Sequence, residues 1–147
     1  MSPSSVCIDA GLVVRRVLFP DDHAVQQAWE AWHAGNIQVF APDLLFYEVT
    51  NALYRYQHLG LLSAETINAA LEAALSLPLT LVSDFDLHRR AKALAEAYHL
   101  PATYDTHYLA LAESLPADLY TCDQRLLKTL EPFHIPWVHG LSTQSAG

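Results

Sequence analysis

The sequence predicts an α/β fold in three layers, with a central parallel sheet of four or five strands flanked by helices. Short apolar runs that suit buried strands alternate with longer segments in which apolar residues recur at helical spacing. Strands that alternate with helices form parallel sheets that are covered on both faces. The expected strands are residues 6–8, 37–42, 79–82 and 117–122, with 136–139 as an edge strand.

Capping residues and helix breakers set the expected helices. Asp22 places an acidic side chain at the start of a helix that Gly35 closes, and Ser63 begins another with a Ser-x-x-Thr pattern. Pro42 is expected in the first turn of its helix, where its missing N–H has no helical partner to lose. The expected helices are residues 12–18, 21–35, 42–60, 63–77, 84–100, 104–115 and 124–130.

The chain of 147 residues suits a single domain, spanning 1–147, with its core at about residues 5–139 and a short polar tail at 141–147. Hydrophobic residues make up 52% of the chain and charged residues 16%, which excludes a disordered protein. No stretch approaches the ~20 apolar residues that a membrane span needs, and we see no secretory signal. Two cysteines are too few for a disulfide framework, so we expect reduced thiols and a cytoplasmic protein.

The formal net charge of −8 argues against broad, nonspecific binding of DNA. It leaves room for a nuclease that uses a metal ion together with a local basic patch. The net charge therefore argues against a general DNA-binding protein but not against a nuclease.

Four acidic residues are expected at one edge of the sheet. Asp9 follows the first strand, Asp123 follows the fourth, Asp105 lies in the first turn of its helix, and Glu48 lies about two turns into the helix after the second strand. Ligand sites in open parallel sheets lie beyond the carboxyl ends of the strands. Asn51 follows Glu48 by three residues and so shares its helical face.

Each of these residues also has a simpler interpretation. Asp9, Asp105 and Asp123 suit helix caps, and Glu48 needs a partner or water because its helix is mostly apolar. If the carboxylates do cluster, a pair about 4 Å apart repels by about 4 kcal/mol at an effective dielectric near 20. Protons or a cation must relieve that repulsion, and hard oxygen ligands suit Mg²⁺ or Mn²⁺. Such an ion can orient a water against a phosphodiester.

Four segments together resemble one known family. They are VCIDAGLVV, APDLLFYEVTNALYR, TYDTHYLALAESL and LYTCDQRLLK. In this order they resemble the PIN-domain ribonucleases and, within them, the VapC-type toxins of toxin–antitoxin pairs, over about residues 5–139. The resemblance implies that Asp9, Glu48, Asp105 and Asp123 are the catalytic residues and surround a divalent metal, Mg²⁺ or Mn²⁺, with Asn51 and Thr121 in support.

The resemblance further implies a metal-dependent endoribonuclease that acts on RNA, is held by an antitoxin protein and forms a homodimer. The chain departs from the family at Gly11, where many relatives carry Ser, Thr or Asn two residues after the first aspartate. The aromatic residues of the second and third helices are expected in the core or against a partner subunit; they are Trp29, Trp32, Tyr54 and Tyr56.

The alternative is a binding module without hydrolytic activity, either a catalytically silent PIN-like domain or a receiver-like domain. A receiver would carry an adjacent acidic pair after its first strand, and none follows residues 6–8. A phosphatase of the haloacid-dehalogenase type would need an aspartate at position 11, where Gly11 stands. His107 is interpreted as a partly exposed surface histidine.

Overall fold

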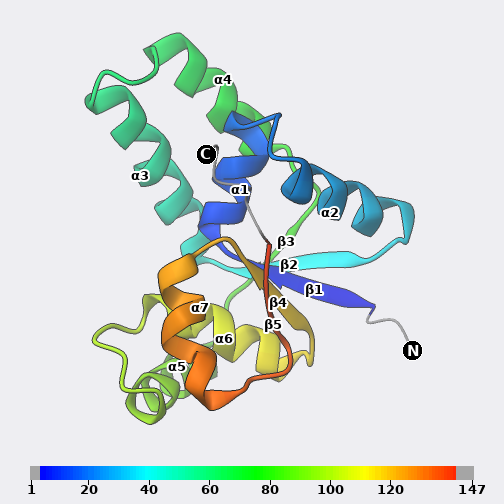
Figure 1. Ribbon diagram of the computed structural model, residues 1–147, viewed down its shortest axis with the longest axis vertical. Helices are drawn as coiled ribbons and strands as arrows, with labels where there is room; N and C mark the ends of the chain where they lie inside the picture. The colour runs from blue at the N-terminus through cyan, green and yellow to red at the C-terminus, as the bar shows by residue number, and fades with distance from the viewer. Residues whose placement is uncertain (1–3, 142–147) are drawn as a thin grey trace.

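A computed structural model describes residues 4–141 and shows five parallel strands in one sheet (Figure 1). The order across the sheet is β3-β2-β1-β4-β5, and each neighbouring pair is parallel. This confirms the expected α/β fold. Residues 142–147, which hold most of the expected polar tail, lie outside the described residues. The strands are β1 (Ser5–Ile8), β2 (Gln38–Pro42), β3 (Thr80–Val82), β4 (Asp118–Thr121) and β5 (Val138–Gly140).

Helices cover both faces of the sheet (Figure 1). On one face α6 contacts β1, β2 and β4, and α5 packs against α6. On the other face α1 contacts β4 and also packs against α2, α3 and α4. The helices are α1 (Ala10–Leu18), α2 (His23–Ala34), α3 (Leu44–His58), α4 (Ala64–Leu75), α5 (Phe85–Ala97), α6 (Tyr104–Ser114) and α7 (Gln124–Leu130), followed by the 3-10 turn η1 (Glu131–Phe133).

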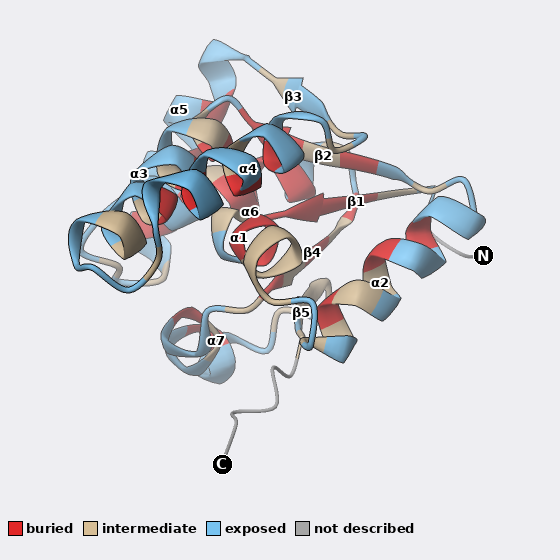
Figure 2. Ribbon diagram, turned by 90° about the horizontal axis from the view of Figure 1, so that it is seen from above, coloured by how far each residue is buried: buried red, intermediate tan, exposed pale blue. Residues whose placement is uncertain are grey.

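The core is centred on β1 and on the middle of α6, where residues 108–112 are all buried (Figure 2). Val6, Cys7 and Ile8 are buried along the whole inner part of β1, as expected for a parallel strand with helices on both faces. Trp29 and Trp32 also belong to this core, with ring centroids 5.6 Å apart. Within residues 4–141 no helix has both the length and the apolar character that a bilayer crossing requires.

Two expected boundaries were wrong. Pro42 is the last residue of β2, as expected, but it is not part of the first turn of α3, because it pairs in register with Val82 of β3. The N–H of Asp43 then donates to the carbonyl of Val82, which continues the strand pairing past the proline. The fourth strand ends at Thr121, one residue earlier than expected, so Asp123 follows it after one intervening residue.

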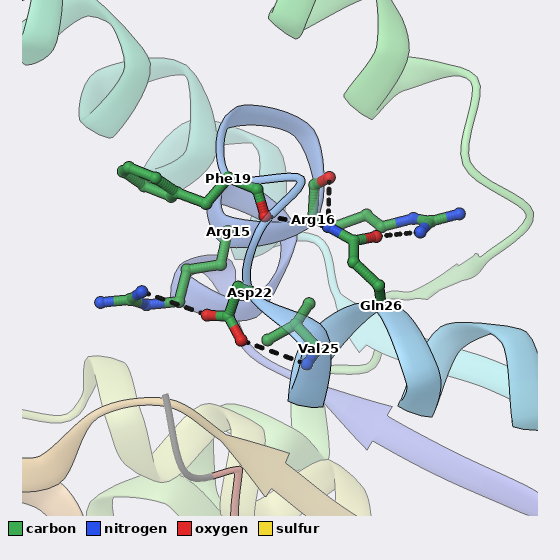
Figure 3. A network of polar contacts seen from close by, with 6 residues as sticks. All are labelled: Arg15, Arg16, Phe19, Asp22, Val25 and Gln26. Carbon is green, nitrogen blue, oxygen red and sulfur yellow. Dashed lines mark hydrogen bonds and ion pairs between the residues drawn. The ribbon is translucent and has the colours of Figure 1, made fainter. Parts of the chain in front are cut away.

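A polar network joins the end of α1 to the start of α2 (Figure 3). The Gln26 side-chain amide donates to the carbonyls of Arg16 and Phe19, at 3.2 and 3.1 Å. Asp22 accepts from the Val25 N–H at 3.3 Å and from the Arg15 guanidinium at 3.2 Å. Gln26 thereby satisfies the Arg16 carbonyl, which the end of α1 leaves without a helical partner, and joins the Asp22 N–H at the Phe19 carbonyl. Together these contacts fix the direction of α1 relative to α2.

We expect Gln26→Leu to lower the free energy of unfolding by about 1–3 kcal/mol, because the Arg16 carbonyl loses its side-chain donor while the Phe19 carbonyl keeps only the Asp22 N–H. Denaturant unfolding followed by circular dichroism measures this. Gln27→Leu is the matched control, because Gln27 is the exposed neighbour on the same helix and should change stability little. Equal effects of the two substitutions would show that the network contributes nothing specific.

Candidate active site at the switch point of the sheet

The strand order reverses direction between β1 and β4, which makes their carboxyl ends the switch point of the sheet. Asp9 follows β1 and Thr121 ends β4, and the two are joined by a hydrogen bond from the Thr121 hydroxyl to Oδ2 of Asp9. Thr121 is fully buried, and its Oγ1 also accepts the Asp123 N–H at 3.0 Å. Thr121 therefore ties the two aspartates that follow adjacent strands.

Asp9 and Asp123 are helix caps as well as neighbours at this edge. Oδ1 of Asp9 accepts the Leu12 N–H at 3.1 Å, which caps α1. Oδ1 of Asp123 accepts the N–H groups of Arg125 and Leu126, at 3.0 and 3.1 Å, which caps α7. Capping thus engages one oxygen of each carboxylate and fixes the direction of the other.

Asp105 is not a cap, so the simpler interpretation fails for this residue. It is the second residue of α6, and the N-cap of that helix is Thr103. The Asp105 side chain is exposed on the first turn of α6. Its position therefore has no capping explanation.

Glu48, which lies in a mostly apolar helix, has a hydrogen-bond partner. The hydroxyl of Tyr108 donates to Oε1 of Glu48 at 2.5 Å, across 60 residues of sequence. Tyr108 is only 2% exposed and lies on α6, three residues after Asp105. Tyr108 was not predicted from the sequence, although its spacing from Asp105 places both residues on one helical face.

The four carboxyl groups are close enough that the charges of some raise the pKa values of others. Burial raises the pKa of Asp9 to about 6, and the nearby charges of Asp105 and Asp123 add to the rise, while hydrogen bonds from Thr121 and Leu12 oppose it. Burial also raises the pKa of Asp105, helped by the charges of Asp123 and Glu48. The pKa of Tyr108 rises through burial and its bond to Glu48, which keeps the phenol protonated as a donor.

The donor set suits a hard divalent cation, because it consists of carboxylate oxygens whose charges repel one another. Within residues 4–141, however, no three His, Cys, Asp or Glu side chains are arranged to hold an ion as they stand. Asp105 and Asp123 are exposed, whereas Asp9 is half-buried and fixed by two hydrogen bonds. Asp105 has no capping bond to lose on rotation, whereas rotation of Asp123 would break its bonds from the Arg125 and Leu126 N–H groups. Binding would therefore require rotation of Asp105 and would use the second oxygen of Asp123.

Asn51 and Gly11 occupy different surroundings. Asn51 is exposed and lines a groove with Tyr47 and Tyr54, and none of the hydrogen bonds between described residues joins it to Glu48. A Cβ added at Gly11 would lie 3.8 Å from Oδ1 of Asp9, in ordinary contact. A polar side chain at position 11 would therefore reach Asp9. Gly11, which has no side chain, cannot make this contact.

The sequence matches the PIN domain family over residues 6–131. The chain belongs to the PIN domain family. Members of this family are typically nucleases, so the receiver-like and phosphatase alternatives are not supported. No relative was found among curated protein sequences.

Two solved structures share the fold of this PIN domain. PAE2754 from Pyrobaculum aerophilum matches with a TM-score of 0.66 and 22% identity, over 93% of this chain and 90% of that one. A toxin–antitoxin complex from Klebsiella pneumoniae matches with a TM-score of 0.64 and 22% identity, over 91% of this chain and 95% of that one. At this identity the likeness concerns the fold.

Without divalent metals, the PIN domain should be more stable with Asp9 protonated. A folded-state pKa of about 6, above the ordinary value of 3.8, adds stability that is complete below pH ~4 and is lost as pH rises through 6. In EDTA, the unfolding free energy of the wild type relative to Asp9→Asn should therefore fall by up to about 3 kcal/mol between pH 4 and 7. Denaturant unfolding at each pH measures this, with Glu72→Gln as the remote control. A constant or rising difference would contradict the expectation.

Removing the charge of Asp105 should relieve repulsion. We expect Asp105→Asn to raise the melting temperature in EDTA by about 2–4 °C, since solvent screening limits the gain to about 1 kcal/mol. Glu65→Gln is the matched control, because Glu65 also lies in a first turn, that of α4, and reports the loss of the helix-dipole interaction alone. If both variants melt alike by differential scanning calorimetry, Asp105 experiences no repulsion.

Proposed function

We propose that this chain is a single-domain, metal-dependent endoribonuclease that hydrolyses RNA phosphodiester bonds and acts in the cytoplasm as the toxin of a toxin–antitoxin pair. The observation that carries the proposal is the shared field of Asp9, Asp105, Asp123 and Glu48 at the switch point, where repulsion contributes to raised pKa values. Uncompensated negative charge of this kind calls for a cation. Membership of a family of nucleases supports the same chemistry.

The residues would divide the work as follows. Asp9, Asp105, Asp123 and Glu48 would hold Mg²⁺ or Mn²⁺, and Thr121 would keep Asp9 in place. The bound ion supplies positive charge that lowers the pKa of a water and offsets the charge that develops on a phosphodiester. Tyr108 occupies Oε1 of Glu48, which leaves Oε2 to orient the attacking water. Asn51 would contribute only at the rim, given its exposed position.

The basic side chains that follow Asp123 offer a place for RNA phosphates. Arg125 and Lys128 lie on α7, and neither forms an ion pair with a described residue, whereas Arg89, Arg90 and Lys92 are each paired with a carboxylate. Such a small patch in a protein of net charge −8 cannot hold RNA by electrostatics alone. We therefore expect selection of particular RNA structures over general binding.

Protein partners would contact the hairpin of α3 and α4, which projects from the sheet (Figure 1). Exposed apolar side chains gather there, namely Tyr54, Leu59 and Leu61, at 54%, 63% and 64% exposure. An antitoxin and a second copy of the chain in a homodimer are the partners that we propose, and the Klebsiella pneumoniae complex supports the first. Trp29 and Trp32 do not contribute, because both are buried in the core.

A catalytically silent PIN domain is the second candidate. A domain without catalytic activity would not need to retain all four acids. This chain has all four, together with the Thr121–Asp9 and Tyr108–Glu48 contacts. These contacts favour the enzyme, and a cleavage assay separates the two candidates.

Purified protein with Mg²⁺ and total RNA should give fragments with 5′-phosphate and 3′-hydroxyl ends, because water rather than the 2′-hydroxyl attacks phosphorus. Asp123→Asn should reduce cleavage at least about 10–100-fold while the fold persists, since Asn caps a helix as well as Asp. Glu72→Gln, an exposed acid on α4, is the control that should cleave normally.

End mapping by sequencing and Mn²⁺ relaxation measure these outcomes. Fragments ending in 2′,3′-cyclic phosphate would exclude the mechanism, and so would cleavage that survives both EDTA and Asp123→Asn. Equal Mn²⁺ binding by the wild type and the triple Asn variant of Asp9, Asp105 and Asp123 would exclude the proposed metal site.

A further inference from the structure

We propose that a hollow beside the acidic site binds one unpaired base of the RNA substrate, and that its rim selects guanine. The hollow has a volume of about 310 Å³ and lies between the N-terminal ends of α3, α5 and α6 and the end of β3. The inference rests on the proposed function, because it assigns the part of the RNA next to the cleaved bond.

Three residues that line the hollow are close neighbours in sequence of two of the acids, Glu48 and Asp105. Tyr47 directly precedes Glu48, Tyr104 directly precedes Asp105, and His107 follows Asp105 by two residues. All three of these ring-bearing residues line the hollow. Consecutive helical side chains point in different directions, so the hollow lies to one side of the acids, at the starts of the same two helices, α3 and α6. We place there the base of a nucleotide next to the one whose phosphate lies at the carboxylates.

The lining is built for stacking. Tyr47 and Tyr104 are 78% and 61% exposed, which packing within the chain does not explain. The apolar side chains of Leu44, Val82 and Leu87 also line the hollow. Unpaired bases of RNA are commonly held by stacking on aromatic side chains, so this combination of rings and apolar lining suits a planar base.

Two histidines hold each other in fixed orientations at the wall. Nδ1 of His107 lies 2.6 Å from the carbonyl oxygen of Thr103, so this nitrogen carries the hydrogen. Nε2 of His107 lies 2.9 Å from Nδ1 of His88, with the rings inclined at 68°, and in this tautomer of His107 it accepts the His88 N–H. With Nδ1 of His88 as the donor, Nε2 of the same ring is left as an acceptor.

The rim consists of hydrogen-bond acceptors. Asp43, Ser83 and Asp84 line the hollow, and Asp43 makes no capping bond to α3, so its carboxylate remains available. No Lys or Arg is among the described residues that line it, which argues against a phosphate as the occupant. A carboxylate accepts two parallel N–H bonds, and guanine alone of the four bases presents adjacent ring and amino donors on its pairing edge.

The test uses the neutral nucleosides guanosine, adenosine, cytidine and uridine with isotope-labelled protein in EDTA. Without phosphate or metal, the probes avoid the acidic site. Guanosine should shift the NMR signals of the Tyr104 and His88 rings saturably, and the other three should bind at least about fivefold more weakly. Tyr104→Ala should weaken guanosine binding at least about fivefold.

Phe85→Ala is the matched control. Phe85 is an 80% exposed aromatic residue at the start of α5, but it does not line the hollow. Its removal should leave guanosine binding unchanged, whereas Asp43→Asn should reduce the preference for guanosine over adenosine. These variants alter exposed side chains, so failure to fold is not a concern.

Absence of saturable shifts, equal effects of Tyr104→Ala and Phe85→Ala, or equal binding of all four nucleosides would overturn the inference. Signals that shift with protein concentration instead would assign the hollow to a contact between protein chains and overturn it as well. The two proposals fail separately: guanosine binding by a protein that leaves RNA intact removes only the nuclease, and cleavage without nucleoside binding removes only the base site.

Discussion

The hydrogen bond between Thr121 and Asp9 is the contact on which the site depends. It joins the ends of β4 and β1 at the switch point, and Thr121 also receives the Asp123 N–H. Because Asp9 begins α1 and Asp123 begins α7, the same contact sets where two helices leave the sheet. The positive ends of both helices then point toward the carboxylates and offset part of their repulsion. Fold and candidate site therefore share one set of bonds.

The capping and functional interpretations of these aspartates are compatible. A cap requires one carboxylate oxygen, and Asp9 and Asp123 each use Oδ1 for it. The second oxygen of Asp9 receives Thr121, which explains why this residue is fixed while Asp105, without a cap, is exposed. An aspartate at a strand-to-helix junction can serve stability and chemistry at once, so its capping geometry does not argue against a functional assignment.

Sequence patterns predicted the parallel sheet and the placement of the acids because both follow from alternation and strand ends. They predicted that β2 ends at Pro42 but wrongly began the next helix at the same residue, because the pairing of Pro42 with Val82, far along the chain, keeps it in the sheet. They also did not predict Tyr108 beside Glu48 or His88 beside His107, because helical periodicity orders residues within an element and says little about which residues meet across elements. The sequence left Trp29 and Trp32 either in the core or against a partner subunit, and the packing of α2 places both in the core.

The separation of Asp9 and Thr121 by 112 residues has a consequence for biosynthesis. A nascent chain that ends before β4 contains Asp9, Glu48 and Asp105 but neither Thr121 nor Asp123. Since β4 lies between β1 and β5, the sheet cannot close at the switch point until this late strand leaves the ribosome. Translation therefore produces most of the chain before the four acids of the candidate site can be brought to one edge of the sheet.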